Sequence, residues 1–275
     1  MNGKYSPLEV AQWLIGIAAV AATNLAEARK QLGASASAPG FRRVEEDVLI
    51  QRGLALFFAG KLRSAVLWRL FMLTANHAAG EAAIASYSEA RDAWATMAER
   101  AKGVYLLNIT YGSGRSLHGH WLDRIPAFDA DIADLRERLA APVAPANKID
   151  SAAAQRALKM ATAEPARPAL AVKHIPEDKF HSGQPFVVTL DCGAAALHGV
   201  RLHYRHVNQA ERWQSAELVR TGTSFQGEIP AAYTVRRFAL QYYFEIAVGP
   251  AEATLFPPLA ADLANVPYFV LRRTD

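Results

Sequence analysis

The spacing of hydrophobic residues changes from helical to strand-like within SAAAQRALKMATAEPARPALAVKHIPEDKFHSGQPFVVTL (151–190). The first twelve residues fit one short helix, a Pro- and Ala-rich segment follows, and Val187–Leu190 fits a β-strand. We therefore predict an α+β multidomain protein. A helical bundle is expected over residues 1–141, a linker over 142–168 and a β-sandwich over 169–275.

The N-terminal half carries apolar residues at helical spacing in four segments. Helices are predicted from Pro7 to about Leu32, from near Arg42 to the break at Asn76, over about 79–102, and over about 126–141. The connections are mostly short, which favours an antiparallel bundle with the second helix as its central, most buried member. Gly53 and Gly60 inside that helix cost about 1 kcal/mol each relative to alanine, and a close crossing by another helix would explain them.

The segment WLIGIAAVAA (13–22) also resembles the core of a secretory signal peptide. A helix of the folded protein is favoured instead, because non-apolar residues trace one helical face through this run, interrupted only by Val20: Glu9, Gln12, Gly16, Thr23, Glu27 and Lys30. The run is shorter than the roughly 20 residues that cross a bilayer, so no membrane span is predicted. Localisation stays open between the cytoplasm and secretion as part of a larger protein.

After residue 169 the apolar period becomes two. Strands are predicted at 187–190, 200–204, 224–229, 240–248 and 268–271, separated by turns that contain Gly, Pro and Asn. About seven short strands in such a length are typical of a β-sandwich. Trp213 is expected to pack against this sandwich rather than to bind a ligand.

Charge and cysteine content exclude several classes of protein. The 30 Lys/Arg and 26 Asp/Glu residues give a net charge of +4 that is spread along the chain, which disfavours nucleic-acid binding. Cys192 is the only cysteine, so no internal disulfide can form, and we expect its thiol to be buried.

The strand-rich half resembles the fibronectin III-like or immunoglobulin-like domains of large bacterial enzymes. The resemblance is carried by VRLHYR (200–205), Trp213, FQGEIPA (225–231) and LQYYFE (240–245). The whole chain is also similar to the C-terminal helical and fibronectin III-like region of large bacterial glycoside-hydrolase-like proteins. That likeness involves YSPLEVAQW (5–13), EDVLIQ (46–51), GHWLDR (119–124), Tyr233 and Gln241–Tyr243. It implies that a catalytic barrel lies upstream, and it transfers no catalytic residue to this chain.

The candidate ligand-binding residues lie between the third and fourth helices. They are Tyr111, Arg115, His118, His120, Trp121 and Asp123. Two imidazoles and a carboxylate within six residues could bind a metal, but no second spaced cluster supplies further ligands, so neither a metal nor a cofactor is predicted. Structural hydrogen bonding is the favoured interpretation. Three further carboxylates follow, with Arg115 and Arg124 expected as their partners: Asp129, Asp131 and Asp134.

No catalytic residue is predicted. The favoured function is a non-catalytic accessory region, for structural support or for carbohydrate or partner binding, of a bacterial carbohydrate-active, glycoside-hydrolase-like protein. Its expected partners are an upstream catalytic domain or a carbohydrate. Two alternatives remain: a small hydrolase with its site in the Gly112–Asp131 loop, and a protein-interaction module.

Overall fold

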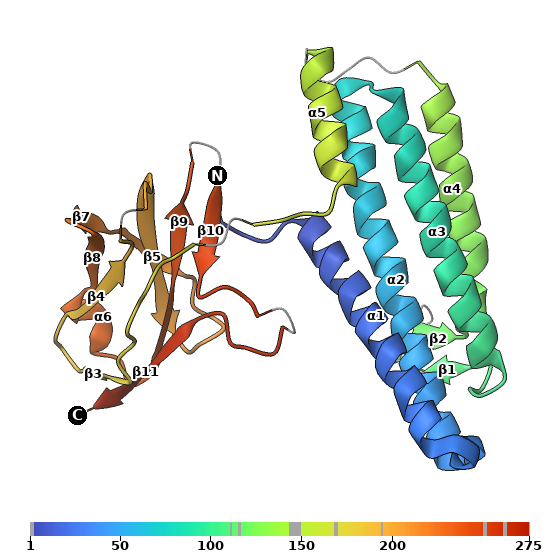
Figure 1. Cartoon of the computed structure of the whole chain (residues 1–275), viewed down its shortest axis with the longest axis horizontal. Coiled ribbons are helices and arrows are strands. Elements are labelled where there is room, and N and C mark those ends of the chain that lie inside the picture. The colour runs from blue at the N-terminus through green and yellow to red at the C-terminus, as the bar shows by residue number, and fades with distance from the viewer. Residues whose placement is uncertain are drawn as a thin grey trace. The chain divides into compact units, whose positions relative to one another are not determined.

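The computed structural model describes residues 3–110, 112–114, 117–142, 150–167, 170–193, 195–249, 252–260 and 263–274. These residues form two compact units, each visible in Figure 1. The helical unit runs from Tyr5 to Ala166. The β unit begins at Arg167 and also includes Gly3 and Lys4 from the start of the chain. The predicted α+β class is confirmed.

The first helix, α1, has the predicted bounds, Pro7–Leu32. The Ser6 hydroxyl accepts a hydrogen bond from the backbone N–H of Glu9 at 3.3 Å, and the Glu9 carboxylate accepts one from the Ser6 N–H at 2.7 Å. This reciprocal cap satisfies two backbone donors that the first turn leaves unpaired. The start of α1 is therefore set by its own local sequence.

The second helix, α2, spans Pro39–Thr74 and follows a short 3₁₀ helix, η1 (Gly33–Ser37). It begins three residues before the predicted start. It contacts α1, α3 and α5, so its predicted central place in the unit is confirmed. Its expected burial is only partly right, because Val44 and Phe58 are 56% and 50% exposed.

The third helix, α3 (His77–Lys102), lies against α2 along a seam of small residues. A Cβ atom added to Gly60 would lie 2.8 Å from the Cβ of Ala90, and one added to Gly53 would collide with Met97. Seven residues separate the two glycines, which places them on the same face of α2. The close crossing predicted from these glycines is confirmed.

The two remaining helices of this unit are α4 (Ile125–Ala140) and α5 (Ser151–Thr162). Ile132 of α4 is buried in a cluster that also contains Phe57 of α2. In α5, Ala161 and Leu158 pack in a cluster with Leu67 of α2. The predicted linker over 142–168 is therefore wrong for α5, which joins the helical unit because its apolar residues pack there.

The β unit contains nine strands within its described residues. They are β3 (Lys179–His181), β4 (Phe186–Asp191), β5 (Gly199–His206), β6 (Gln214–Glu217), β7 (Val219–Thr221), β8 (Ser224–Ile229), β9 (Leu240–Ala247), β10 (Ala253–Phe256) and β11 (Phe269–Thr274). One sheet has the order β3-β11-β9-β5-β6, with β10 also beside β9. The other has the order β4-β8-β7. All pairings are antiparallel except that of β3 with β11.

Residues from both sheets share one hydrophobic core. Alternate residues of β4 point into it, and β5 follows the same alternation. The buried members from four strands include Val188, Leu202, Ile229 and Phe244. Cys192 is buried at the end of β4, as predicted, and burial raises the pKa of its thiol.

The start of the chain belongs to the β unit, which corrects the predicted boundary between the two domains. Gly3 is buried, and a Cβ atom at this position would lie 2.9 Å from the backbone carbonyl oxygen of Thr254. The Arg167 guanidinium donates hydrogen bonds to the carbonyl oxygens of Gly3 at 2.7 Å and Lys4 at 2.8 Å. The helical unit is therefore inserted between two neighbouring segments of the β unit.

The segment Pro7–Ser37, which contains α1, is long and apolar enough to cross a membrane by length and composition. Only 11% of its most apolar window is buried. Core helices of soluble proteins and signal sequences have the same length and composition, so this property alone does not assign α1 to a membrane. The prediction that the run is too short to span a bilayer does not hold for the helix as a whole.

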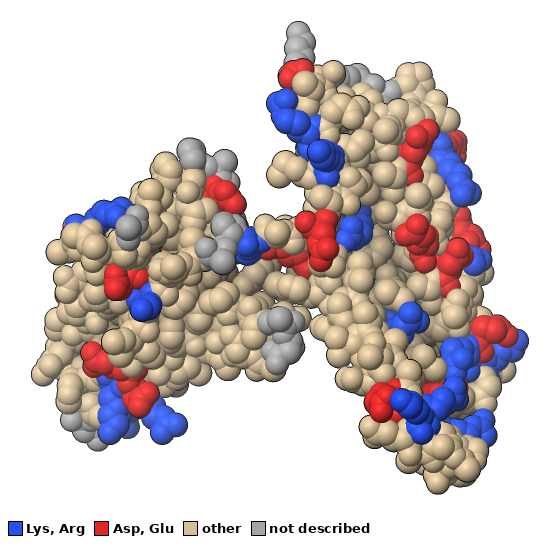
Figure 2. Space-filling model, in the orientation of Figure 1, with Lys and Arg blue, Asp and Glu red and all other residues tan. Residues whose placement is uncertain are grey.

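Charged side chains are mixed over the surface seen in Figure 2. Lys and Arg lie among Asp and Glu on both units, with no continuous field of one sign on this face. This distribution agrees with the dispersed charge of the sequence.

Candidate functional site

The predicted candidate loop joins α3 to α4 at one end of the helical unit (Figure 1). Its described part contains a short antiparallel pairing of β1 (Ile109–Thr110) with β2 (His118–Gly119). A 3₁₀ helix, η3 (Trp121–Arg124), follows and continues directly into α4. The described residues are thus a folded connection between packed helices.

His120 and Asp123 together cap η3. The backbone N–H of His120 donates to Asp123 Oδ2 at 2.7 Å, and the backbone N–H of Leu122 donates to His120 Nδ1 at 3.2 Å. Because Nδ1 is an acceptor, the ring proton lies on Nε2. His120 is only 4% exposed, and its Nε2 has no hydrogen-bond partner among the described residues. His120 is buried and Asp123 is exposed, and each side chain accepts a hydrogen bond from a backbone N–H of this segment.

Trp121 seals the same end of the helical unit. Its backbone oxygen accepts a hydrogen bond from Trp94 Nε1 at 2.7 Å. Its ring meets Tyr105 edge to face at 5.5 Å, and it packs with Ile50 and Met97. These contacts support a packing role for the indole.

The remaining predicted site residues do not join this pair in the described structure. His118 is exposed, and its Nδ1 lies 3.3 Å from the Thr110 hydroxyl. Tyr111 and Arg115 lie outside the described residues. The structure therefore brings together three of the predicted residues, His120, Trp121 and Asp123, and directs His118 to a separate contact.

The carboxylates at the start of α4 have partners other than the predicted arginines. Asp129 accepts hydrogen bonds from Arg91 at 2.8 and 3.1 Å, and these bonds hold the pKa of this carboxyl below its usual value. Asp131 accepts the Tyr87 hydroxyl at 2.6 Å, and burial, followed by this contact, raises the pKa of Tyr87. These bonds fasten α4 to α3. Arg115 lies outside the described residues, and the partners found for Asp129 and Asp131 are Arg91 and Tyr87 rather than the expected Arg124.

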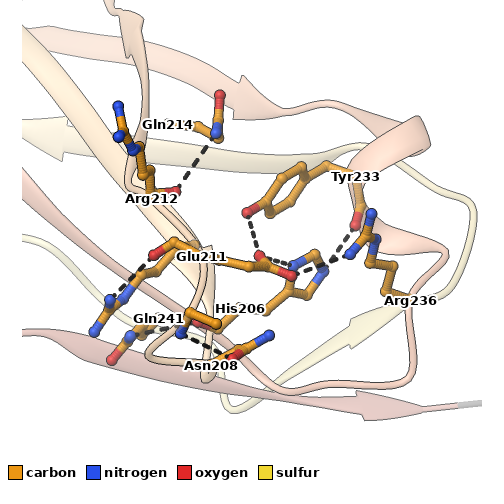
Figure 3. A network of polar contacts seen from close by, with 10 residues as sticks. His206, Asn208, Glu211, Arg212, Gln214, Tyr233, Arg236 and Gln241 are labelled. Atoms are coloured by element: carbon orange, nitrogen blue, oxygen red, sulfur yellow. Dashed lines mark hydrogen bonds and ion pairs between the residues drawn. The ribbon is translucent and has the colours of Figure 1, made fainter.

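A second polar cluster, in the β unit, was not predicted (Figure 3). His206 is fully buried on β5, with Nδ1 2.7 Å from Glu211 Oε2 and Nε2 3.1 Å from the carbonyl oxygen of Tyr233. The His206 and Tyr233 rings stack at 4.3 Å. Both ring nitrogens therefore lie beside hydrogen-bond acceptors, one a carboxylate oxygen and the other a carbonyl oxygen.

Glu211 is the centre of this cluster. It also accepts the Tyr233 hydroxyl at 3.1 Å and the Arg236 guanidinium at 3.2 Å. The hydrogen bond with His206, followed by those other contacts, lowers the pKa of Glu211, while burial and the same carboxylate raise the pKa of Tyr233 to about 12. All of these contacts are within the protein, and they join the loop after β5, which carries Glu211, to the segment after β8, which carries Tyr233 and Arg236. The sequence signal that could have indicated this cluster is the placement of His206 and Glu211 on either side of a turn.

Trp213 packs on the outer side of this sheet, as predicted. Its ring meets Tyr243 edge to face at 4.8 Å, and the Arg205 guanidinium lies 4.7 Å from its centre. One face of the indole is thus taken by a cation of the protein itself.

Within the described ranges, no group of three or more His, Cys, Asp or Glu side chains is arranged to hold a metal ion. The chain was also compared with known proteins. No family model, no curated protein and no solved structure matches it.

Proposed function

We propose that this chain is a non-catalytic accessory region of a bacterial carbohydrate-active, glycoside-hydrolase-like protein. The main support is the hydrogen bonding of His120 and Asp123. Each of these two side chains accepts a backbone N–H of the η3 segment, so both serve the backbone of the loop. A general acid or base would instead need to reach a substrate within hydrogen-bond distance.

We further propose that the β unit is a fibronectin III-like or immunoglobulin-like sandwich. Its strand order supports this assignment, since β4-β8-β7 and β3-β11-β9-β5-β6 share one core. Lys173, before β3, forms a β-bridge with Asp191 of β4, whereas β3 itself pairs with β11 of the other sheet, so this segment contributes to both sheets. Most residues that carry the sequence resemblance lie on β5, β8 and β9, whereas Trp213 directly precedes β6.

In this proposal the two units support an upstream catalytic domain or bind its carbohydrate substrate. The test uses the purified full chain with soluble polysaccharides and with chromogenic glycosides. We expect hydrolysis to equal the buffer blank, and we expect either saturable polysaccharide binding or a stable complex with a catalytic domain encoded in phase upstream. Turnover that is lost in folded His120→Ala and Asp123→Ala variants would overturn the proposal.

One observation favours the alternative of a small hydrolase with its site in the Gly112–Asp131 loop. The buried Nε2 of His120 has no partner among the described residues, and an unpaired buried nitrogen is often a functional group. That alternative predicts that His120→Gln abolishes hydrolysis while the fold is retained. The absence of any hydrolysis by the wild-type chain would remove it.

A further inference from the structure

A cavity of about 480 Å³ lies in the helical unit, away from the candidate loop. It is bounded by residues of α1, α2, α3 and α5, and its volume is within the range of small-molecule sites. Its wall is largely formed by small apolar residues, including Ala59, Gly60, Ala90 and Ala93. The polar side chains that also line the cavity are few: Arg63, Ser86, Glu89 and Thr162.

The cavity contains one arginine whose hydrogen bonding is incomplete. Arg63 donates one hydrogen bond from its terminal nitrogen to the Gln12 side-chain oxygen at 2.9 Å. Its Nε is buried and has no partner among the described residues. Gln12 is itself held by Glu164, to which its amide nitrogen donates at 2.9 Å. The guanidinium is thus positioned by a neutral amide and keeps donors for another acceptor.

The charge around Arg63 favours a singly charged anion over a multiply charged one. No carboxylate in the described part of the chain forms an ion pair with Arg63. An arginine fork matches a carboxylate in two parallel hydrogen bonds. Glu89 also lines the cavity and is exposed, so it would repel a ligand that carries several negative charges.

We propose that this cavity binds a small monocarboxylate with an apolar body, such as a medium-length acyl chain. Arg63 holds the carboxylate, and the wall of Ala59, Gly60, Ala90 and Ala93 covers the chain. This proposal concerns a different place and a different chemistry from the carbohydrate role proposed above, so the result of either test does not decide the other.

The test titrates the full chain with octanoate, followed by calorimetry and by NMR shifts of alanine methyl groups. Octanol has the same chain without the charge. We expect saturable octanoate binding that shifts Ala90, Ala93 and Ala161, and binding of octanol weaker by about tenfold or more because it lacks the charged hydrogen bonds.

Three variants distinguish octanoate binding at this cavity from non-specific hydrophobic binding elsewhere on the protein. Arg63→Gln should weaken octanoate binding about tenfold or more, and Ala93→Leu should block it by filling the wall. Arg52→Gln is the matched control: Arg52 is on the same helix and also has a buried Nε without a partner among the described residues, but it lines other cavities. The Arg52→Gln variant should bind octanoate with the same affinity as the wild type.

Three results would overturn the proposal once far-UV circular dichroism shows that the variants are folded. They are no saturable binding of octanoate, equal binding of octanol, and equal losses in Arg63→Gln and Arg52→Gln.

Discussion

The backbone N–H of Gly3 donates a hydrogen bond of 2.6 Å to the buried carboxylate of Glu245, 242 positions away in the chain. The other carboxylate oxygen lies 2.8 Å from His203 Nε2 on the neighbouring strand. Burial acts to raise the pKa of Glu245, but the bonds from His203 and Gly3 and the charge of Arg201 outweigh it and lower the pKa. The carboxylate thus fastens the start of the chain to the centre of a sheet.

Acid should weaken the β unit through this carboxylate. A lowered folded pKa means that the unfolded chain takes up the proton first as the pH falls. The stabilisation is therefore complete above the ordinary value of 4.5 and is lost as the pH falls through the folded pKa. Glu245→Gln should cost about 1–3 kcal/mol near neutral pH and should reduce the acid dependence.

The measurement is urea unfolding at neutral and acid pH, followed by amide signals of β9. Glu217→Gln is the control, because Glu217 is an exposed carboxylate of the same sheet, paired with Arg201 at 2.6 Å. Equal losses in the two variants would show that burial of Glu245 does not matter.

Gly60→Ala should destabilise the helical unit, although alanine is the better helix former. The added Cβ would lie 2.8 Å from Ala90 Cβ and from the backbone oxygen of Ser86, which costs about 1–3 kcal/mol. Gly16→Ala in α1 meets nothing within 4 Å and should gain up to about 1 kcal/mol from helix propensity. Thermal unfolding at 222 nm compares the two, and a gain in both would contradict the close crossing.

Glu211→Ala should destabilise the β unit by about 2–3 kcal/mol, because it leaves the fully buried His206 without its carboxylate. Arg236→Gln removes only an exposed partner of the same carboxylate and should change stability by less than about 0.5 kcal/mol. Chemical denaturation measures both. A loss in Arg236→Gln as large as that in Glu211→Ala would argue against the central role of His206.

His174 should resist protonation in the folded chain. Its Nδ1 lies 2.7 Å from the carbonyl oxygen of Thr189, and its Nε2 lies 2.7 Å from the Tyr242 hydroxyl, an arrangement that suits a neutral ring. Burial lowers its pKa and outweighs the opposing effects of Thr189 and Glu177. The neutral His174 ring therefore contributes fully to stability at pH values above its ordinary pKa of 6.5. This contribution is lost as the pH falls through the lower pKa of the folded state.

NMR titration of the His174 ring in the folded chain, compared with the same ring in urea, tests this prediction. The folded midpoint should be the lower one. A folded midpoint at or above the unfolded one would show that the ring is not held neutral.

Elements with local signals could be predicted from the sequence. The cap of Ser6 and Glu9 fixes the start of α1, and the predicted short helix over 151–162 has the bounds of α5. The apolar patterns of 187–190 and 200–204 predicted β4 and β5, whose residues alternate in burial. In contrast, β6 (Gln214–Glu217) has no such alternation, because its place depends on pairing with β5 rather than on its own pattern.

The polar contacts depend on distant residues, and for that reason they were mostly missed. Asp129 pairs with Arg91, 38 positions earlier, and no local spacing connects them. The placement of α5 in the helical unit likewise depends on Leu67, far from it in sequence. The candidate loop was identified because its His, Trp and Asp residues are close in sequence, whereas their role became clear only from the backbone groups that they bond.

The central claim is that His120 and Asp123 serve the structure of the α3–α4 connection. Equilibrium unfolding of His120→Asn and His120→Ala tests it most directly, since the Asn side chain can accept the Leu122 N–H as His120 Nδ1 does. We predict that His120→Asn stays within about 0.5 kcal/mol of the wild type and that His120→Ala loses about 1 kcal/mol. Unchanged stability in both variants would contradict the account.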